Sequence, residues 1–318
     1  MKWEKIGKVF DPTDHVLANN CTEFAQAPQA LVFDEFIRVY FSSRERDPVG
    51  GKCRSHIAFV DLTKDLSSIL RVSDRTVIEL GKLGCFDEHG IFPMNVLRHG
   101  GRVHGYTCGW NRRVSVSVET AIGLAISSDD GITFQKIGDG PVLGPSLHEP
   151  FLVGDPFVRV HDGLFHMWYI FGTLWRRFLP GQPPDRVYKI GHAVSGDGIS
   201  WEKEEGRRLV ADSLNPHESQ ALPTVVKIGA RWHMLFCFRE SSDFRENRDR
   251  GYRIGYAWSD DAKHWTRNDA VVGIDVTPGS WDSDMLCYPH AFECDGKVYL
   301  LYNGNEFGRY GFGAAILL

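Results

Sequence analysis

The sequence lacks a membrane-spanning run, and its opening leads us to expect no secretory leader. No stretch approaches the about 18 consecutive apolar residues that a spanning helix needs, and the opening MKWEKIGKVF has no apolar core of the kind that signal peptides carry. An excess of positive charge is also missing, because 36 Lys and Arg stand against 41 Asp and Glu for a formal net charge of −5. This balance argues against nucleic acid or an anionic membrane as the bulk partner.

Paired cysteine motifs are absent as well. The seven cysteines are an odd number and none has CxxC spacing, so the sequence predicts free, mostly buried thiols, and neither a disulfide framework nor a zinc site. Free thiols are typical of a reducing compartment, and we therefore expect a cytoplasmic protein. No linker or low-complexity segment interrupts the 318 residues, whose 42% hydrophobic and 24% charged content is that of an ordinary globular chain.

A long-period repeat runs through the chain. IGLAISSDDGITFQKI, IGHAVSGDGISWEKE and IGYAWSDDAKHWTRN align on Ala125, Ala193 and Ala257, and weaker copies surround Ala58 and Ala315. The copy around Ala315 ends before its tail, whereas KWEKIGKVF near the start resembles the missing part. The pattern predicts five units, the last of which is completed by the N-terminal strand.

Each unit is predicted to form four β-strands. A run opened by proline, such as DPFVRVH or LPTVVKI, precedes an alternating apolar run, such as LFHMWYIFG or RWHMLFCF, and the repeated phrase with its tail follows. Period-two alternation, β-branched and aromatic residues and Gly/Asp turns indicate strands. The expected fold is all-β, a five-bladed β-propeller with four strands per blade, closed by the N-terminal strand and forming one domain over residues 1–318.

The repeated turns are assigned to the scaffold, and the functional segments are expected elsewhere. Phe134, Trp201 and Trp265 follow these Asp/Gly turns and should pack between blades. The second and third strands are joined by long, irregular connections, SSRERDPVGGKCR, GWNRRVSVSVET, FGTLWRRFLPGQPPDR, FRESSDFRENRDRGY and NGNEFGRYG. In a four-stranded blade these connections fall on one face, so all five should converge on one mouth of the central funnel. Long loops on a rigid scaffold carry function, so the functional site is expected at this mouth.

The connections that enter the first strand of each unit bring acidic residues to the same mouth. Glu23, Glu88, Glu218 and Asp284 each stand five residues before a proline, whereas Asp155 directly precedes Pro156. Carboxyl groups that lie close together shift one another's pKa values, so that a protonated and an ionised group can act together at a glycosidic bond. The alternative is that some of these acids cap turns or pair with arginine.

Other polar and aromatic side chains of the mouth segments are candidates for ligand binding. These candidates are Arg112, Arg176, Arg239, Trp110, Trp175, Asn303 and Asn305, together with Asp284 and His290. Arginines suit a carboxylate or phosphate on the ligand, or internal pairing with the acids. Tryptophan offers a flat face to a sugar ring, or packs within its loop. No metal-ligand spacing is present, so no cofactor is expected, with a Ca²⁺-like ion in the central channel left as an option.

The motifs GDPFVRVHDGLFHMWY, HESQALPTVV and YRIGYAWSDDAKHW resemble the blades of the five-bladed propeller glycosidases of glycoside hydrolase families 32, 43 and 130. The resemblance covers the whole chain as architecture. It implies that Asp155 is the carboxylate that orients the substrate and that Glu218 is the general acid. Ala27 stands where those families have a blade-one aspartate, so the base would come from elsewhere, with Glu88 and Asp87 as candidates.

Two hypotheses for the function follow. The leading one is a glycoside hydrolase acting on a small or terminal sugar unit, with Arg239 and Arg176 holding the ligand. The alternative is a non-catalytic propeller that binds a sugar or glycoconjugate and is linked to polysaccharide metabolism, which the missing blade-one acid favours. The expected partner in both is a small-molecule carbohydrate or glycoconjugate, with an anionic one as an option. A protein-interaction propeller is a third option, which a charged mouth disfavours.

Overall fold

The computed structural model describes residues 1–46 and 52–318, and the regular secondary structure of these residues is almost entirely β. One antiparallel sheet has the order β1 (Trp3–Phe10), β20 (Phe312–Leu317), β19 (Lys297–Asn303) and β18 (Cys287–Cys294). A second has the order β10 (Val153–His161), β11 (Leu164–Arg176), β12 (Asp185–Ser195) and β13 (Glu202–Lys203). A third has the order β14 (Ser219–Ile228), β15 (Arg231–Arg239), β16 (Arg253–Ser259) and β17 (Thr266–Arg267).

The remaining strands form one larger sheet of two similar halves. The first half comprises β2 (Glu23–Val32), β3 (Ile37–Arg46), β4 (Cys53–Leu62) and β5 (Ile69–Val72), and the second β6 (Gly90–His99), β7 (Arg102–Arg112), β8 (Val118–Ser127) and β9 (Gln135–Lys136). A single parallel bridge between Ser55 and Gly90 joins them. The described helices are short, α1 (Asn305–Gly308) and the 3₁₀ turns η1 (Pro12–Asp14), η2 (Arg248–Arg250) and η3 (Asp269–Val271), and none could cross a membrane.

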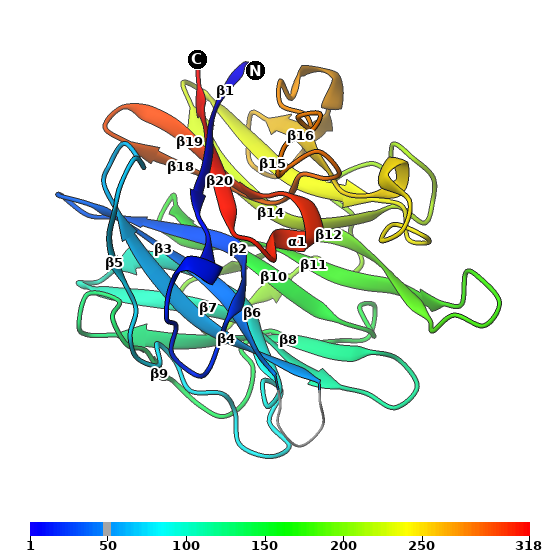
Figure 1. Ribbon diagram of the computed structural model, residues 1–318. Coiled ribbons are helices and arrows are strands. Elements are labelled where there is room, and N and C mark those ends of the chain that lie inside the picture. Colours follow the sequence, from blue (N-terminus) through cyan, green and yellow to red (C-terminus); the bar gives the residue numbers. More distant parts are fainter. Residues whose placement is uncertain (47–51) are drawn as a thin grey trace.

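The sheets are arranged around a common centre (Figure 1). The strands β2, β6, β10, β14 and β18 lie innermost, each packs against the next, and β18 packs against β2. The ring of contacts is therefore closed, although no single hydrogen-bonded sheet runs around it among the described residues. The apolar residues between neighbouring sheets form the core, which includes Trp168, Phe236 and Leu300, all fully buried.

The N-terminal strand completes the last sheet, as the sequence predicts. Strand β1 pairs antiparallel with β20, with Trp3 opposite Leu317 and Phe10 opposite Phe312. Figure 1 shows the blue β1 lying beside the red β20. The amide of Trp3 also donates to the Gly273 carbonyl at 3.3 Å. The two ends of the chain thus hold each other in one sheet.

Each innermost strand carries the same irregularity. In all five, two consecutive residues oppose one residue of the neighbouring strand, and the second of the two is proline. These pairs are Ala27–Pro28, Phe92–Pro93, Asp155–Pro156, Leu222–Pro223 and Tyr288–Pro289. Such a bulge is a suitable place for proline, which has no N–H to contribute to the ladder, and it re-aims the side chain that precedes it. The scaffold therefore repeats one specialised position five times.

The aromatic residues of the repeated turns pack between sheets, which confirms their predicted role. Three edge-to-face pairs join a turn to the second strand of the preceding unit, Phe134 with Tyr40, Trp201 with Tyr106 and Trp265 with Trp168. The Tyr40 hydroxyl also donates to the carbonyl of Gly131 in the turn at 2.7 Å. These turns belong to the scaffold because their side chains are used for packing.

The seven cysteines are all free thiols, as the sequence predicts. Five of them are buried and the other two are half-buried. Burial raises the pKa of Cys108 and Cys237 far above the ordinary value for a thiol. Both side chains are therefore protonated and act as small apolar groups in the scaffold.

Buried histidines make the fold sensitive to acid. Burial lowers the pKa of His290 to about 3, and burial together with nearby His166 lowers the pKa of His192 to about 4. Since an unfolded histidine titrates at about 6.5, the unfolded chain binds more protons below that pH, and stability should fall as the pH drops from about 6.5 towards 4. Thermal unfolding between about pH 7.5 and 4.5 tests this, and His192→Gln should flatten the decline. An unchanged slope in that variant would contradict the assignment.

Candidate functional site

A cavity of about 1090 Å³ opens on one side of the ring of sheets. All five long connections contribute lining residues, among them Lys52 before β4, Arg113 before β8, Arg177 before β12, Arg245 before β16 and Arg309 before β20. Their convergence on one mouth confirms the sequence-based expectation, although residues 47–51 of the first connection lie outside the described residues. The site is thus built by loops far apart in the sequence and held by the inner strands.

Asp155 occupies the bulge of β10 and faces this cavity. Its backbone has a φ of 50°, and its side chain accepts a hydrogen bond from the Leu222 amide at 3.3 Å. Burial raises the pKa of this carboxyl to about 7, with partial opposition from that hydrogen bond and from the charge of Arg186. A carboxyl with such a pKa is available both as a proton donor and as a proton acceptor near neutral pH.

The same bulge position carries no other acid in the five described inner strands. Ala27, Phe92, Leu222 and Tyr288 are its counterparts in β2, β6, β14 and β18. In the structure, Ala27 occupies the position in β2 that Asp155 occupies in β10. This agrees with the sequence, in which Ala27 stands where the similar glycosidase families have an aspartate. Phe92 and Tyr288 also line the cavity, so three of the five bulge positions contribute to it.

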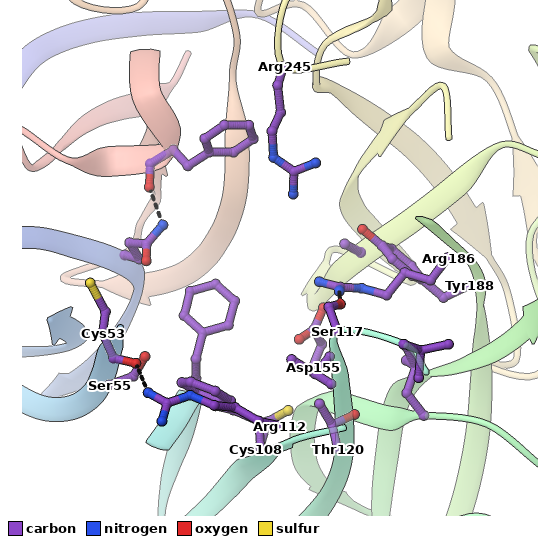
Figure 2. A pocket seen from close by; sticks show the side chains of 18 of the residues that line it. Cys53, Ser55, Cys108, Arg112, Ser117, Thr120, Asp155, Arg186, Tyr188 and Arg245 are labelled. Atoms are coloured by element: carbon purple, nitrogen blue, oxygen red, sulfur yellow. Dashed lines mark hydrogen bonds between the residues drawn. The ribbon is translucent and has the colours of Figure 1, made fainter. Parts of the chain in front are cut away.

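Arginine and tyrosine side chains surround the acid. Figure 2 shows Arg186 and Tyr188 of β12 beside Asp155, with Arg245 directed into the cavity from above. Arg239 is only 2% exposed, and its Nη2 donates to the Tyr188 hydroxyl at 3.1 Å. The Tyr188 and Tyr252 hydroxyls are 2.6 Å apart. This end of the cavity therefore offers several hydrogen-bond donors to a ligand next to Asp155.

The Arg239 guanidinium is a buried charge with incomplete compensation. It stacks over Phe244 at 3.5 Å, and its carboxylate contact, Asp185, is 3.7 Å away. Its Nε is buried and has no hydrogen-bond partner among the described residues. A buried donor left unpaired is unfavourable, so an anionic ligand near this side chain would be stabilised.

The cavity as a whole is strongly cationic. Its described lining contains nine Arg or Lys residues and two carboxyl groups, those of Asp155 and Glu306. The whole chain, in contrast, has a formal net charge of −5. Positive charge is therefore concentrated at this site, where it favours an anionic ligand.

Four residues predicted from the sequence lie together in the cavity lining, namely Asp155, Arg239, Arg112 and Trp110. In Figure 2 a dashed line joins Arg112 to the backbone of β4, where its Nη2 donates to the Cys53 carbonyl at 3.0 Å. Trp110 stacks on His89 with ring centroids 5.9 Å apart. The structure thus brings together a carboxyl, two arginines and an aromatic ring from the predicted set.

Glu218, in contrast, does not line the cavity. It is fully buried, its Oε1 is 2.6 Å from Nη1 of Arg267, and its Oε2 accepts from the amides of Ser213 and Leu214. Burial by itself would raise the pKa of Glu218, but the Arg267 charge and these hydrogen bonds outweigh it and hold the pKa below its usual value. The geometry does not support the predicted role of proton donor, because the carboxyl is ionised and enclosed.

The two candidate bases are also outside the cavity lining. Asp87 is buried and forms an ion pair with Lys136 of β9. Glu88 accepts a hydrogen bond from the Gly84 amide at 2.8 Å in its own loop. Both carboxylates support the connection before β6, which corrects the expectation that one of them faces the substrate.

The remaining predicted residues support the walls of the site or lie beyond it. Asn303 is buried and ties β19 to β2 by accepting from the Ala27 amide at 2.8 Å. Asn305 accepts from the amide of Asp284 at 2.7 Å, and the Asp284 carboxylate pairs with Arg248 at 3.2 Å at a neighbouring small pocket.

Three more of the predicted binding residues are outside the lining. His290 is buried between aromatic rings, Arg176 is exposed near His217, and Trp175 lies beneath the Arg186 guanidinium, 5.7 Å from it. None of these three contributes to the described cavity lining, so the binding role predicted for them is not supported.

Sequence reasoning missed several lining residues. Arg186, Tyr188, Tyr252, Tyr288 and Arg245 line the cavity around Asp155. Tyr288 carried a usable signal, because it directly precedes Pro289 as Asp155 precedes Pro156. Arg186, Arg245 and Tyr252 belong to connections that were predicted to reach the mouth, but only the folded arrangement selects them from the other residues of those loops.

Comparison with known proteins places the chain in a family. No family model matches it. A Mycobacterium tuberculosis (strain ATCC 25618 / H37Rv) protein, uncharacterized protein Rv1502, is 33% identical over 321 residues, which cover 100% of this chain and 99% of the relative. The chain belongs to the same family as this mycobacterial protein. A Thermoanaerobacter sp. (strain X514) β-1,2-mannobiose phosphorylase is 29% identical over 147 residues, which cover 43% of this chain and 46% of the relative.

Solved structures share the fold of this chain. A structure described as a glycoside hydrolase has a TM-score of 0.74 at 16% identity, covering 98% of this chain and 90% of its own length. A thermostable family-43 glycoside hydrolase has a TM-score of 0.65 at 13% identity, covering 92% of this chain and 88% of its own length. A structure from the GH130 family, which contains mannoside phosphorylases and glycoside hydrolases, has a TM-score of 0.68 at 14% identity, covering 99% of this chain and 93% of its own length. The chain therefore has the β-propeller fold found in these glycosidases.

Proposed function

We propose that this protein cleaves a glycosidic bond by acid-assisted attack of inorganic phosphate, as a glycoside phosphorylase does. The observation that carries the proposal is Asp155, a buried carboxyl whose pKa is raised to about 7 in a cationic cavity. In this reaction the Asp155 proton passes to the glycosidic oxygen as its bond to the anomeric carbon breaks. A phosphate oxygen forms the new bond to that carbon, so the products are a glycosyl phosphate and a free sugar.

The charges of the cavity suit this reaction better than hydrolysis. Hydrolysis of a glycoside ordinarily uses two carboxyl groups, one as acid and one as base or nucleophile. Phosphate brings its own negative charge and needs no carboxylate to activate it. Arg186, which lies beside Asp155, and Arg239 of the same cavity lining supply donors whose geometry matches phosphate oxygens.

The comparisons support the same direction. The Thermoanaerobacter relative is described as a phosphorylase. The GH130 structural neighbour comes from a family that contains mannoside phosphorylases. Hydrolysis, the reaction expected from the sequence, is the second candidate, and the observation that favours it is Glu306, the other carboxyl of the lining. A protein that only binds its sugar is the third.

The setting that we propose is a five-bladed propeller whose funnel holds one small or terminal sugar unit. Each of the five innermost strands with its bulge would begin one blade. A cavity lined by nine cationic side chains is unfavourable for a divalent metal, so we propose that the reaction needs no metal cofactor. A cytoplasmic location fits both the seven free thiols and the supply of phosphate.

Turnover is expected to depend on inorganic phosphate. The purified protein would be incubated with a panel of disaccharides, with and without phosphate, and ³¹P NMR would detect any glycosyl phosphate. Signals that appear only with phosphate and a saccharide support the proposal, because the arginines then hold the nucleophile. Equal sugar release without phosphate would assign hydrolysis, and sugar binding without any turnover would assign a binding protein.

A further inference from the structure

The rim of the cavity carries more positive charge than a single phosphate needs. Each of the five connections brings one cationic residue there, namely Lys52, Arg113, Arg177, Arg245 and Arg309. The first four of these are exposed and Arg309 is half-buried. Since the connections are unrelated in sequence, the repetition of a cation in every one is a property of the site and not of the repeat.

Internal ion pairs do not account for all of this charge. Arg113 pairs with Glu119, and Arg309 pairs with Glu23 at 2.8 Å and with Glu306 at 3.2 Å. No carboxylate pairs with Arg177 among the described residues, and its Nη1 donates only to the carbonyl of Gln182 at 3.0 Å.

Arg245 is only weakly compensated. Its nearest ion-pair contact is Asp185 at 3.5 Å, and that carboxylate also contacts Arg239. Figure 2 shows the Arg245 guanidinium directed into the cavity rather than along its own loop. Among the rim arginines, Arg177 and Arg245 are therefore the most available to a ligand.

Two tiers of cations can be distinguished by depth. Arg186, beside Asp155, is half-buried and Arg239 is buried, whereas Arg177 and Arg245 are exposed at the mouth. A phosphate carries about two negative charges near neutral pH, which the inner pair, Arg186 and Arg239, can match. The outer tier then lacks an anion, although a saccharide extending from Asp155 towards solvent would pass beside it.

We propose that the saccharide substrate is itself acidic and that Arg177 and Arg245 hold its fixed anionic substituent, a carboxylate, sulfate or phosphate ester. This inference rests on the proposed function only in assuming that the cavity binds a carbohydrate. The planar guanidinium groups can bind any of these three substituents through paired hydrogen bonds. The outer tier thus selects acidic over neutral saccharides, and the inner tier serves the reaction.

Direct binding measurements test this selection without relying on turnover. A glycan array and isothermal titration would compare the binding of matched acidic and neutral oligosaccharides. The pairs are a uronic acid oligosaccharide and its carboxyl-reduced form, a sulfated oligosaccharide and its desulfated form, and a phosphorylated oligosaccharide and its dephosphorylated form. The responding pair identifies the substituent. Arg177→Gln combined with Arg245→Gln should weaken binding of the acidic member about tenfold, as expected for the loss of two partly exposed charge pairs.

The controls separate local contacts from general charge. Arg75→Gln combined with Arg231→Gln removes the same charge from exposed arginines outside the cavity, paired with Asp74 and Asp260, and should leave binding unchanged. The acidic preference should also weaken in high salt, since the screening length falls from about 10 Å at 0.1 M to about 3 Å at 1 M.

Each outcome of these binding measurements either supports or overturns the inference. Acidic preference that is lost in the Arg177/Arg245 variant supports the inference. Equal binding of acidic and neutral members overturns it while the carbohydrate function stands, and a preference that survives in the variant overturns the assignment to these arginines. Failure to bind any saccharide, in either form, would overturn the proposed function and this inference together.

Discussion

Replacing Asp155 by asparagine is expected to lower the turnover of a glycoside with a poor leaving group by about 10²- to 10⁴-fold, the range that a general acid contributes. Asparagine has nearly the same shape and can still accept the Leu222 amide hydrogen bond, so folding and sugar binding should persist. A glycosyl fluoride of the same sugar should lose far less, because fluoride leaves with little need for a proton. Steady-state rates on the two substrates measure the difference.

The pH dependence of the wild-type protein provides a second readout for Asp155. Because only the protonated carboxyl can donate, turnover should decline as the pH rises through the pKa of about 7. Asp284→Asn is the matched control, since that aspartate lies outside the main cavity lining and should leave turnover unchanged. Glu306→Gln distinguishes the alternative, because a strong loss there would indicate a hydrolase with Glu306 as its base. Undiminished turnover in Asp155→Asn would remove the acid from the mechanism.

The Asp155→Asn substitution should also stabilise the fold at alkaline pH. The pKa of Asp155 is raised in the folded state, so the folded protein retains a proton that the unfolded chain releases between about pH 4 and 7. The cost of ionising the buried carboxyl is therefore absent at low pH and complete above about pH 7. Asparagine carries no such cost, and its advantage in melting temperature should grow across that interval.

Replacing Glu218 by alanine is expected to cost about 3–5 kcal/mol of unfolding free energy, the usual effect of removing one partner of a buried ion pair. The Arg267 side chain, only 6% exposed, would lose its 2.6 Å contact, and the amides of Ser213 and Leu214 would lose their acceptor. Asp269 would remain as the second partner of Arg267 at 2.8 Å. Urea unfolding of the variant and the wild type measures the difference.

The effect of Glu218→Ala on catalysis separates a structural from a catalytic role. At a temperature where the variant remains folded, its kcat should stay within a few-fold of the wild type, because Glu218 does not line the cavity. Glu218→Gln serves as the comparison, since it retains an acceptor for the amides and should cost less stability. A collapse of kcat in folded Glu218→Gln would contradict the structural role and restore the acid predicted from the sequence.

The sequence was sufficient to predict features that depend on local patterns. Alternating strands, packing aromatics and the closing N-terminal strand all follow from the repeat, and Asp155 stands out because it directly precedes a proline. The role of Glu218 could not be predicted in this way. Its distance from Pro223 places it near the mouth, but Arg267, which is 49 residues away in the chain, encloses it in the structure.

The cation-rich character of the cavity was only partly visible in the sequence. The long connections are rich in arginine, yet the acidic residues nearby leave the pairing of these arginines open until the fold is known. Arg239 illustrates the limit, because a buried arginine over Phe244 with a distant carboxylate is indistinguishable in sequence from a paired one. Long-range partners, rather than residue types, decide which charges face a ligand.

The pairing of β1 with β20 has a consequence for the synthesis of the protein. More than 300 residues separate Trp3 from its partner Leu317 in the chain, so at about 5–20 residues per second β1 waits on the order of 15–60 s for β20 to be made. An unpaired strand edge invites aggregation during such a delay. Glu4, Lys5 and Lys8 place charges along β1, and charged edge residues are a common protection against this hazard. The strand that completes the ring is thus also suited to remain alone in the nascent chain.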